Sequence, residues 1–200
     1  VADEVICGFG RTGRWFGVDN WSVVPDMLTI GKGLTSGYMP LSGVAVGGEI
    51  YDVLTTRPEE FTFWQGFTYN AHPGCCAAAL QTIEILDKEH LVDHAQRMGR
   101  RLLDRLRPLE SSPIVGDVRG LGLLAGVEIV ADKRSRAPFP EGRGSALVRR
   151  HCLERGLIVR AISDTIALCP PLVIMEAEVD HVADVVTDAV HEATVALDRG

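Results

Sequence analysis

The spacing of the hydrophobic residues changes at Pro73, and this change constrains the fold more than any other feature. Three apolar runs of strand length precede it, at residues 1–7, 27–30 and 41–46. After it, apolar residues recur at spacings of three and four, at Cys76, Ala79, Leu80, Ile83 and Leu86. Polar residues 87–89 interrupt the stripe, which resumes and stops at Pro108. The chain therefore combines strands with amphipathic helices.

A polar, proline-bounded stretch at residues 108–113 predicts a domain boundary. We therefore assign residues 1–107 to one domain and residues 108–200 to a second, small α+β domain. The patterns of the second domain predict strands at residues 121–130, 157–162 and 165–168. They predict helices at residues 145–155 and 176–199, the last with an apolar stripe that serves core packing.

The composition argues against several classes of partner. A formal net charge of −7 disfavours nucleic acid. The arginines between residues 97 and 107 are interspersed with Asp93, Asp104 and Glu110, as on a solvated helix face. No apolar stretch reaches the roughly 18 residues of a membrane span, and no signal peptide begins the sequence. We therefore predict a cytoplasmic protein without nucleic-acid or membrane partners. Because the sequence lacks an initial Met and begins within a strand pattern, we expect it to be the C-terminal part of a longer protein.

The cysteines and histidines do not indicate a metal site or a disulfide framework. Five cysteines is an odd number, none forms a C-x-x-C motif, and all lie in apolar runs. His90 and His94 are four residues apart, but Glu89 precedes them, where a metalloprotease helix needs the Glu directly after the first His.

Residues 8–13, Gly-Phe-Gly-Arg-Thr-Gly, match the G-x-G-x-x-G pattern of a dinucleotide-binding turn. Such a turn must open a helix, and residues 14–21 have no helical period. The acidic residue expected about 20 positions later is also missing. The sequence therefore disfavours a nicotinamide oxidoreductase, without excluding it.

Lys32 stands between two glycines after an apolar run, and it is one of only three lysines in the chain. Lys88 and Lys133 have charged neighbours, as solvated residues do. A lysine withdrawn from water favours its uncharged amine, the nucleophile that forms Schiff bases. The simpler alternative is a lysine at a strand end that extends its ammonium into water.

Asp3 lies among apolar residues of the first predicted strand, where a carboxylate is costly to bury without a cation. A salt bridge to Arg11 or Arg14 would be a purely structural explanation. Glu4 should lie on the opposite face of the strand, either exposed or paired. A buried carboxylate on one strand and a buried lysine after the next are, however, what pyridoxal phosphate requires.

Three segments together resemble the class III, or omega, aminotransferases of pyridoxal-phosphate fold type I. These are VADEVICGFGRTG at residues 1–13, DMLTIGKG at residues 26–33 and GFTYNAHPGCCAAAL at residues 66–80. The resemblance covers essentially the whole chain. It implies an α/β fold: the C-terminal part of the large cofactor-binding domain, a mixed sheet with flanking helices, followed by the small α+β domain.

The resemblance also implies roles for individual residues. Asp3 would pair with the pyridinium nitrogen of pyridoxal 5'-phosphate, and Val5 would pack against its ring. Lys32 would be the Schiff-base lysine and would then move the proton as general base and acid. Thr68, with the Phe67 backbone, would reach the cofactor phosphate of the neighbouring subunit, which makes a homodimer with a shared active site part of the expectation.

The segment GLIVRAISDTIALCPPLVI, residues 156–174, resembles the branch that acts on amines and omega-amino acids with pyruvate. Arg160 occupies the position of a mobile arginine that binds a substrate carboxylate, for which a guanidinium is well suited. The alternative is a solvated arginine at a strand end. The expected activity is transfer of an amino group from an amine or omega-amino acid to pyruvate or a similar keto acid.

The family's phosphate-binding turn and the aromatic residue that stacks on the cofactor have no counterpart in these 200 residues. The chain alone is therefore expected to be inactive. An incomplete chain with only a structural or interaction role is the alternative to an enzyme.

Overall fold

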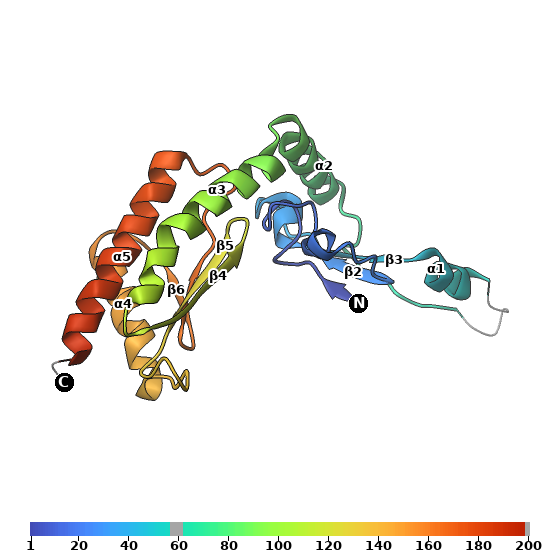
Figure 1. Cartoon of the computed structure of the whole chain (residues 1–200). Coiled ribbons are helices and arrows are strands. Elements are labelled where there is room, and N and C mark those ends of the chain that lie inside the picture. The colour runs from blue at the N-terminus through green and yellow to red at the C-terminus, as the bar shows by residue number, and fades with distance from the viewer. Residues whose placement is uncertain (57–61, 199–200) are drawn as a thin grey trace. The chain divides into compact units, whose positions relative to one another are not determined.

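The computed structural model describes residues 1–56 and 62–198 of the chain (Figure 1). The chain divides into two compact units between Asp93 and His94.

The first unit contains a three-stranded mixed sheet with the order β1-β2-β3. The strand β1 (Ala2–Asp3) is parallel to β2 (Met27–Ile30), and β3 (Gly43–Val46) is antiparallel to β2. The unit also contains the helices α1 (Gly48–Thr55) and α2 (Pro73–Lys88) and the short 3₁₀ helices η1 (Gly17–Trp21) and η2 (Lys32–Thr35). The predicted strand at residues 27–30 is confirmed. So is the helix that begins at Pro73, a residue that fits the first turn because it needs no hydrogen-bond donor.

The strand predicted at residues 1–7 is wrong beyond Asp3. The N–H of Val5 donates a hydrogen bond to Asp3 Oδ1 at 3.1 Å, and the N–H of Gly8 donates to the carbonyl of Glu4 at 2.9 Å. These local hydrogen bonds turn the chain away from the sheet. Val5 therefore does not share a strand face with Asp3.

The second unit contains a four-stranded antiparallel sheet with the order β4-β5-β7-β6. Its strands are β4 (Val115–Leu121), β5 (Leu124–Ile129), β6 (Arg160–Ile162) and β7 (Thr165–Leu168). Its helices are α3 (Leu91–Leu106), α4 (Arg143–Glu154) and α5 (Glu176–Asp198), with the 3₁₀ helices η3 (Arg107–Ser111) and η4 (Pro140–Gly142). Helices on an antiparallel sheet give the α+β arrangement expected of the small domain.

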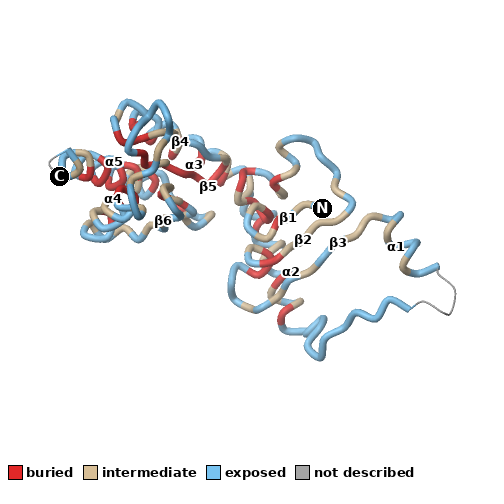
Figure 2. The backbone as a smooth tube through the Cα atoms, turned by 90° about the horizontal axis from the view of Figure 1, so that it is seen from below, coloured by how far each residue is buried: buried red, intermediate tan, exposed pale blue. Residues whose placement is uncertain are grey.

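The hydrophobic core of this unit lies between its helices and its sheet, and Figure 2 shows buried residues along α3, α4, α5 and β5. Each of these elements supplies side chains with no exposed surface, among them Leu102, Val127, Val148 and Val186. The strand β7 adds Ile166, which also has no exposed surface. The apolar stripe predicted for the last helix is thus a core-packing face. The sequence predicts that this helix ends at residue 199, which lies outside the described residues.

Two strand predictions in the second unit need correction. The single strand predicted at residues 121–130 is the end of β4 and all of β5, joined by a turn at residues 122–123. The sequence does not predict β4 because Gly116, Asp117, Arg119 and Gly120 interrupt its apolar pattern. The strand predicted at residues 157–162 begins only at Arg160.

The helix α3 packs within the second unit, although the sequence places it before the domain boundary. Ala95, Leu102 and Leu106 of α3 have no exposed surface and belong to the core of that unit. The proline-bounded stretch that suggests the boundary is largely η3, whose Leu109 is buried in the same core. The domain assignment itself, residues 1–107 and 108–200, stays a prediction.

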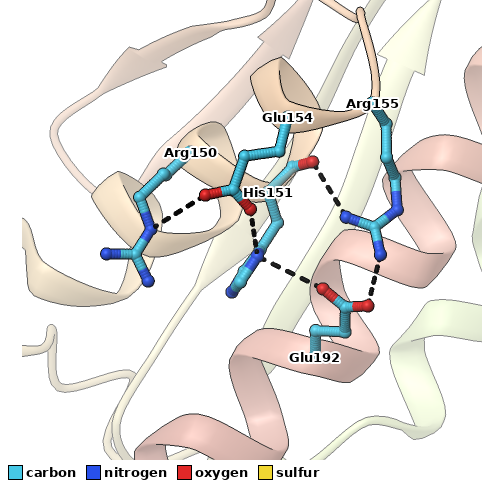
Figure 3. A network of polar contacts seen from close by, with 5 residues as sticks. All are labelled: Arg150, His151, Glu154, Arg155 and Glu192. Carbon is cyan, nitrogen blue, oxygen red and sulfur yellow. Dashed lines mark hydrogen bonds and ion pairs between the residues drawn. The ribbon is translucent and has the colours of Figure 1, made fainter.

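A polar network joins α4 to α5 at the surface of the second unit (Figure 3). The Nδ1 atom of His151 lies 3.1 Å from Glu154 Oε2 and 3.2 Å from Glu192 Oε2. Arg155, the residue directly after α4, forms an ion pair with Glu192. Within α4, Arg150 Nε lies 3.7 Å from Glu154 Oε1. Because carboxylates accept hydrogen bonds only, Nδ1 of His151 carries a proton in this arrangement.

Candidate active site

Asp3 and Lys32 come together at one edge of the first unit's sheet. Asp3 ends β1, Lys32 follows β2 after Gly31, and the two strands are parallel neighbours. The carboxyl ends of both strands therefore meet at the same edge. In α/β sheets, ligands bind outside this edge.

One oxygen of the Asp3 carboxylate is fixed and the other is free. Oδ1 accepts a hydrogen bond from Thr29 Oγ1 at 3.0 Å and another from the N–H of Val5 at 3.1 Å. Thr29 is the residue paired with Asp3 across the two strands. Within the described residues Oδ2 has no donor, so the carboxylate is oriented with one oxygen available to a ligand N–H.

Lys32 begins η2 and has a left-handed backbone, with φ of 42°. Leu34 and Thr35 of η2 are buried, and Thr35 Oγ1 donates to the carbonyl of Met39 at 2.6 Å. The helix is thereby anchored behind Lys32. Among residues 1–56 and 62–198 no side chain pairs with the Lys32 ammonium.

The prediction that Asp3 and Lys32 are buried is wrong, because both side chains are exposed in the structure. The strand β1 is an edge strand of two residues, so the described chain covers the carboxyl ends of β1 and β2 on too few sides to exclude water. In the described part of the chain, the Asp3 carboxylate is held by Thr29 and a backbone N–H, and no salt bridge joins it to Arg11 or Arg14.

The other predicted site residues lie in different surroundings. Val5 is half-buried next to Asp3, in the turn after β1. Phe67, which is 76% exposed, and Thr68 lie in an exposed segment after residue 61, and Phe67 O accepts a hydrogen bond from the N–H of Asn70 at 3.0 Å. Arg160 is exposed at the start of β6 in the second unit. The structure thus brings together Asp3, Val5 and Lys32 among the predicted residues.

The groups at this sheet edge suit pyridoxal phosphate. A carboxylate with one free oxygen can accept the N–H of a protonated pyridine ring, and an unpaired lysine amine can bond to an aldehyde. Thr68 is the candidate donor to a phosphate. The described residues contain no group of three or more metal-binding side chains, and none of their helices is long and apolar enough to cross a membrane.

Two residues that build this site were not assigned a role from the sequence. Thr29 orients the Asp3 carboxylate, and Glu4 is buried with an exposed fraction of 3%. A threonine in an otherwise apolar strand and a second carboxylate next to Asp3 are the signals that could indicate them. The register that pairs Thr29 with Asp3 is not visible in the sequence.

The family model for class III aminotransferases matches residues 1–190. The chain therefore belongs to the class III aminotransferase family.

Curated relatives agree with this assignment. The chain is 41% identical over 198 residues to the putrescine–pyruvate aminotransferase of Pseudomonas aeruginosa. This match covers 98% of this chain and 43% of the relative. It is 38% identical over 191 residues to a probable mitochondrial gamma-aminobutyrate transaminase 3 of Oryza sativa, covering 94% of this chain and 38% of the relative. The chain thus spans less than half of the length of these relatives.

Solved structures share the fold. The omega transaminase of Pseudomonas jessenii in complex with PMP matches with a TM-score of 0.94 at 36% identity, over 100% of this chain and 44% of that one. A transaminase of the marine bacterium Virgibacillus matches with a TM-score of 0.91 at 41% identity, over 98% of this chain and 45% of that one. The predicted α/β fold of the fold type I aminotransferases is confirmed.

Proposed function

We propose that the chain forms part of a transaminase that uses pyridoxal 5'-phosphate to pass an amino group from an amine or omega-amino acid to pyruvate or a similar keto acid. The observation that carries the proposal is the pair of Asp3 and Lys32 at the carboxyl ends of two parallel strands, with Asp3 oriented by Thr29. The names of the relatives, a putrescine–pyruvate aminotransferase and gamma-aminobutyrate transaminases, support this choice of donor and acceptor.

When bound, pyridoxal phosphate supplies an aldehyde that carries the amino group and a ring that withdraws electrons from the reacting carbon. Asp3 would keep the ring nitrogen protonated through its free Oδ2, because Thr29 and the N–H of Val5 hold Oδ1. Lys32 Nζ would hold the cofactor, and after its release it would act as the general base and acid that moves a proton away from the substrate carbon.

Four further residues complete the proposal. Arg160 would bind the carboxylate of the keto acid with its guanidinium. Val5 would pack against the cofactor ring. Phe67 and Thr68 would reach the cofactor phosphate in a neighbouring copy, so the active enzyme would be a homodimer with a shared site. The exposure of Phe67 and Thr68 in this chain leaves them available for such contacts. We place the enzyme in the cytoplasm.

Borohydride reduction in the presence of pyridoxal phosphate, followed by peptide mapping, tests the proposal, because reduction makes the bond between a lysine and the cofactor permanent. The wild-type protein should carry the cofactor on Lys32. A Lys32→Arg variant should lose the label, whereas a Lys88→Arg variant, which alters an exposed lysine paired with Glu84, should keep it.

An unlabelled Lys32 in the wild-type protein would contradict the cofactor assignment. A labelled Lys32 in a protein without transaminase activity would support the alternative of an incomplete enzyme.

A further inference from the structure

The proposed function leaves the glycine-rich segment at residues 8–17 without a role. In the structure this segment belongs to a loop, residues 4–18, that is closed by Glu4. The backbone N–H of Gly17 donates to Glu4 Oε2 at 2.7 Å, and the N–H of Val18 donates to Oε1 at 2.8 Å. The carbonyl of Glu4 accepts the N–H of Gly8 at 2.9 Å. One residue thus holds both the start and the end of the loop.

The Glu4 carboxylate is buried without a cationic partner. Its exposed fraction is 3%, and within the described residues no Lys or Arg pairs with it. The two backbone N–H groups therefore supply the stabilisation that a buried carboxylate requires. A neutral amide would present N–H groups to one of these donors, so Glu4→Gln should open the loop without changing the size of the side chain.

The loop packs against both glycines that flank Lys32. A Cβ on Gly33 would lie 3.1 Å from the Cβ of Phe9, and a Cβ on Gly31 would lie 3.7 Å from Val5 Cγ1. Phe9 is buried, and its ring contacts Phe16 edge-on with centroids 5.6 Å apart. The absence of a side chain at position 33 therefore lets Phe9 approach the backbone next to Lys32 closely, whereas Val5 makes an ordinary contact at position 31.

Glu4 is also joined directly to the strand that leads to Lys32. Its backbone N–H donates to the carbonyl of Thr29 at 3.0 Å, and Thr29 is the residue that orients Asp3. The loop closed by Glu4 thus contacts the Asp3 segment at one end and the Lys32 segment along its side. Within its G-x-G-x-x-G pattern, Gly8 packs closely, since a Cβ there would lie 2.8 Å from the carbonyl oxygen of Glu4, while Gly10 and Gly13 have positive φ of 92° and 78°. No helix of dinucleotide-binding type follows, since η1 has only five residues.

We propose that Glu4 is a positioning residue of the active site: by closing the loop of residues 4–18, it holds the backbone of Lys32 in place relative to Asp3. The inference rests on the roles proposed above for Asp3 and Lys32. Glu4 itself is buried and does not contact the substrate or the cofactor.

The first test needs no cofactor. Hydrogen–deuterium exchange of Glu4→Gln should show faster exchange at Gly17 and Val18, and also in the segment of residues 31–36, where the Leu34 N–H donates to the carbonyl of Gly31 at 3.0 Å. We expect an acceleration of about tenfold in that segment. The exposed carboxylate of Glu49 provides the control, because Glu49→Gln should leave the segment unchanged.

The second test reaches the same contact from the other side. Gly33→Ala would press a methyl group against Phe9, which must shift by a few tenths of an ångström. Both Glu4→Gln and Gly33→Ala should slow the labelling of Lys32 by pyridoxal phosphate and borohydride about tenfold, and both should move the pH profile of that labelling in the same direction. A residue that only stabilises the fold would lower the unfolding midpoint without moving this profile.

The outcomes separate the inference from the proposed function. Unchanged exchange at residues 31–36 in Glu4→Gln would overturn the inference, even if Lys32 binds the cofactor. Faster exchange there, in a protein whose Lys32 is never labelled, would support the positioning of Lys32 by Glu4 and contradict the proposed function. If Glu4→Gln does not fold, the exchange and the pH profile of Gly33→Ala decide.

Discussion

Gly99 of α3 lies directly against the backbone of Gly122 in the turn between β4 and β5. A Cβ on Gly99 would lie only 2.1 Å from the carbonyl oxygen of Gly122, far inside van der Waals contact. The helix can approach this turn only because position 99 has no side chain. The close approach explains a glycine in the middle of an amphipathic helix, where helix propensity disfavours it.

Gly99→Ala should therefore destabilise the protein, because the added methyl group meets backbone that cannot move aside. We expect a loss of about 3 kcal/mol in the free energy of unfolding, measured by urea denaturation. Gly48→Ala in α1 is the control: no atom lies within 4 Å of its added Cβ, so its unfolding midpoint should not fall. Equal midpoints for Gly99→Ala and the wild type would contradict the close approach.

In the whole enzyme of which this chain forms part, Arg160→Gln should weaken the use of keto acid acceptors if Arg160 binds their carboxylate. The loss of a charged hydrogen bond predicts a KM for pyruvate about 10 to 100 times higher, while the KM for an amine donor without a carboxylate stays the same. Arg149→Gln, at an exposed position of α4, controls for the loss of a positive charge. Equal increases in KM for donor and acceptor would argue that Arg160 acts on the fold instead.

Cys152 should resist alkylation in the folded protein. Burial raises the pKa of its thiol to about 11, against a lowering by the nearby charge of Arg155, and its side chain has no exposed surface. Iodoacetamide at about pH 8 should modify the exposed Cys169 at least about 100 times faster than Cys152. In urea the two rates should converge, and similar rates in the folded protein would show that Cys152 is not buried.

The ion pair between Arg101 and Asp180 should make stability depend on pH in the acid range. Arg101 Nε and Nη2 donate to the two oxygens of Asp180 at 2.8 and 2.7 Å, and this hydrogen bonding holds the pKa of Asp180 below its ordinary value of 3.8. The contribution of this ion pair to the free energy of unfolding is therefore complete above pH 3.8, the ordinary pKa of Asp. It is lost as the pH falls through the lowered pKa that Asp180 has in the folded protein.

Asp180→Asn should accordingly lower the urea midpoint at pH 7, and its difference from the wild type should shrink as the pH falls toward about 3. Asp188→Asn removes an exposed carboxylate from the same helix and should show no such trend. A difference that stays constant across this range would mean that the ion pair does not contribute.

The sequence predicts the helices of this chain better than its short strands. The apolar stripe on either side of residues 87–89 predicts the bounds of α2 and α3 closely. The apolar spacing indicates helices, and Pro73 and Pro108 mark the start of the first and the end of the second. The strand β4 escapes prediction because its pairing with β5 supplies what its own residues lack. Local pattern carries no information on such long-range pairing.

The site shows the same division between local and long-range information. Asp3 and Lys32 stand out in the sequence because a charge in an apolar run needs an explanation. Their exposure depends on which elements cover a sheet edge, and the roles of Thr29 and Glu4 depend on strand register and loop closure. These relations arise only when distant segments meet.

The left-handed backbone of Lys32 limits replacement at this position apart from any chemistry. Residues branched at Cβ are strained in that conformation, whereas glycine and asparagine adopt it readily. In a relative without the transaminase activity, we would thus expect Gly or Asn at position 32. The backbone conformation of the turn would still restrict which residues occur there after the lysine had been replaced.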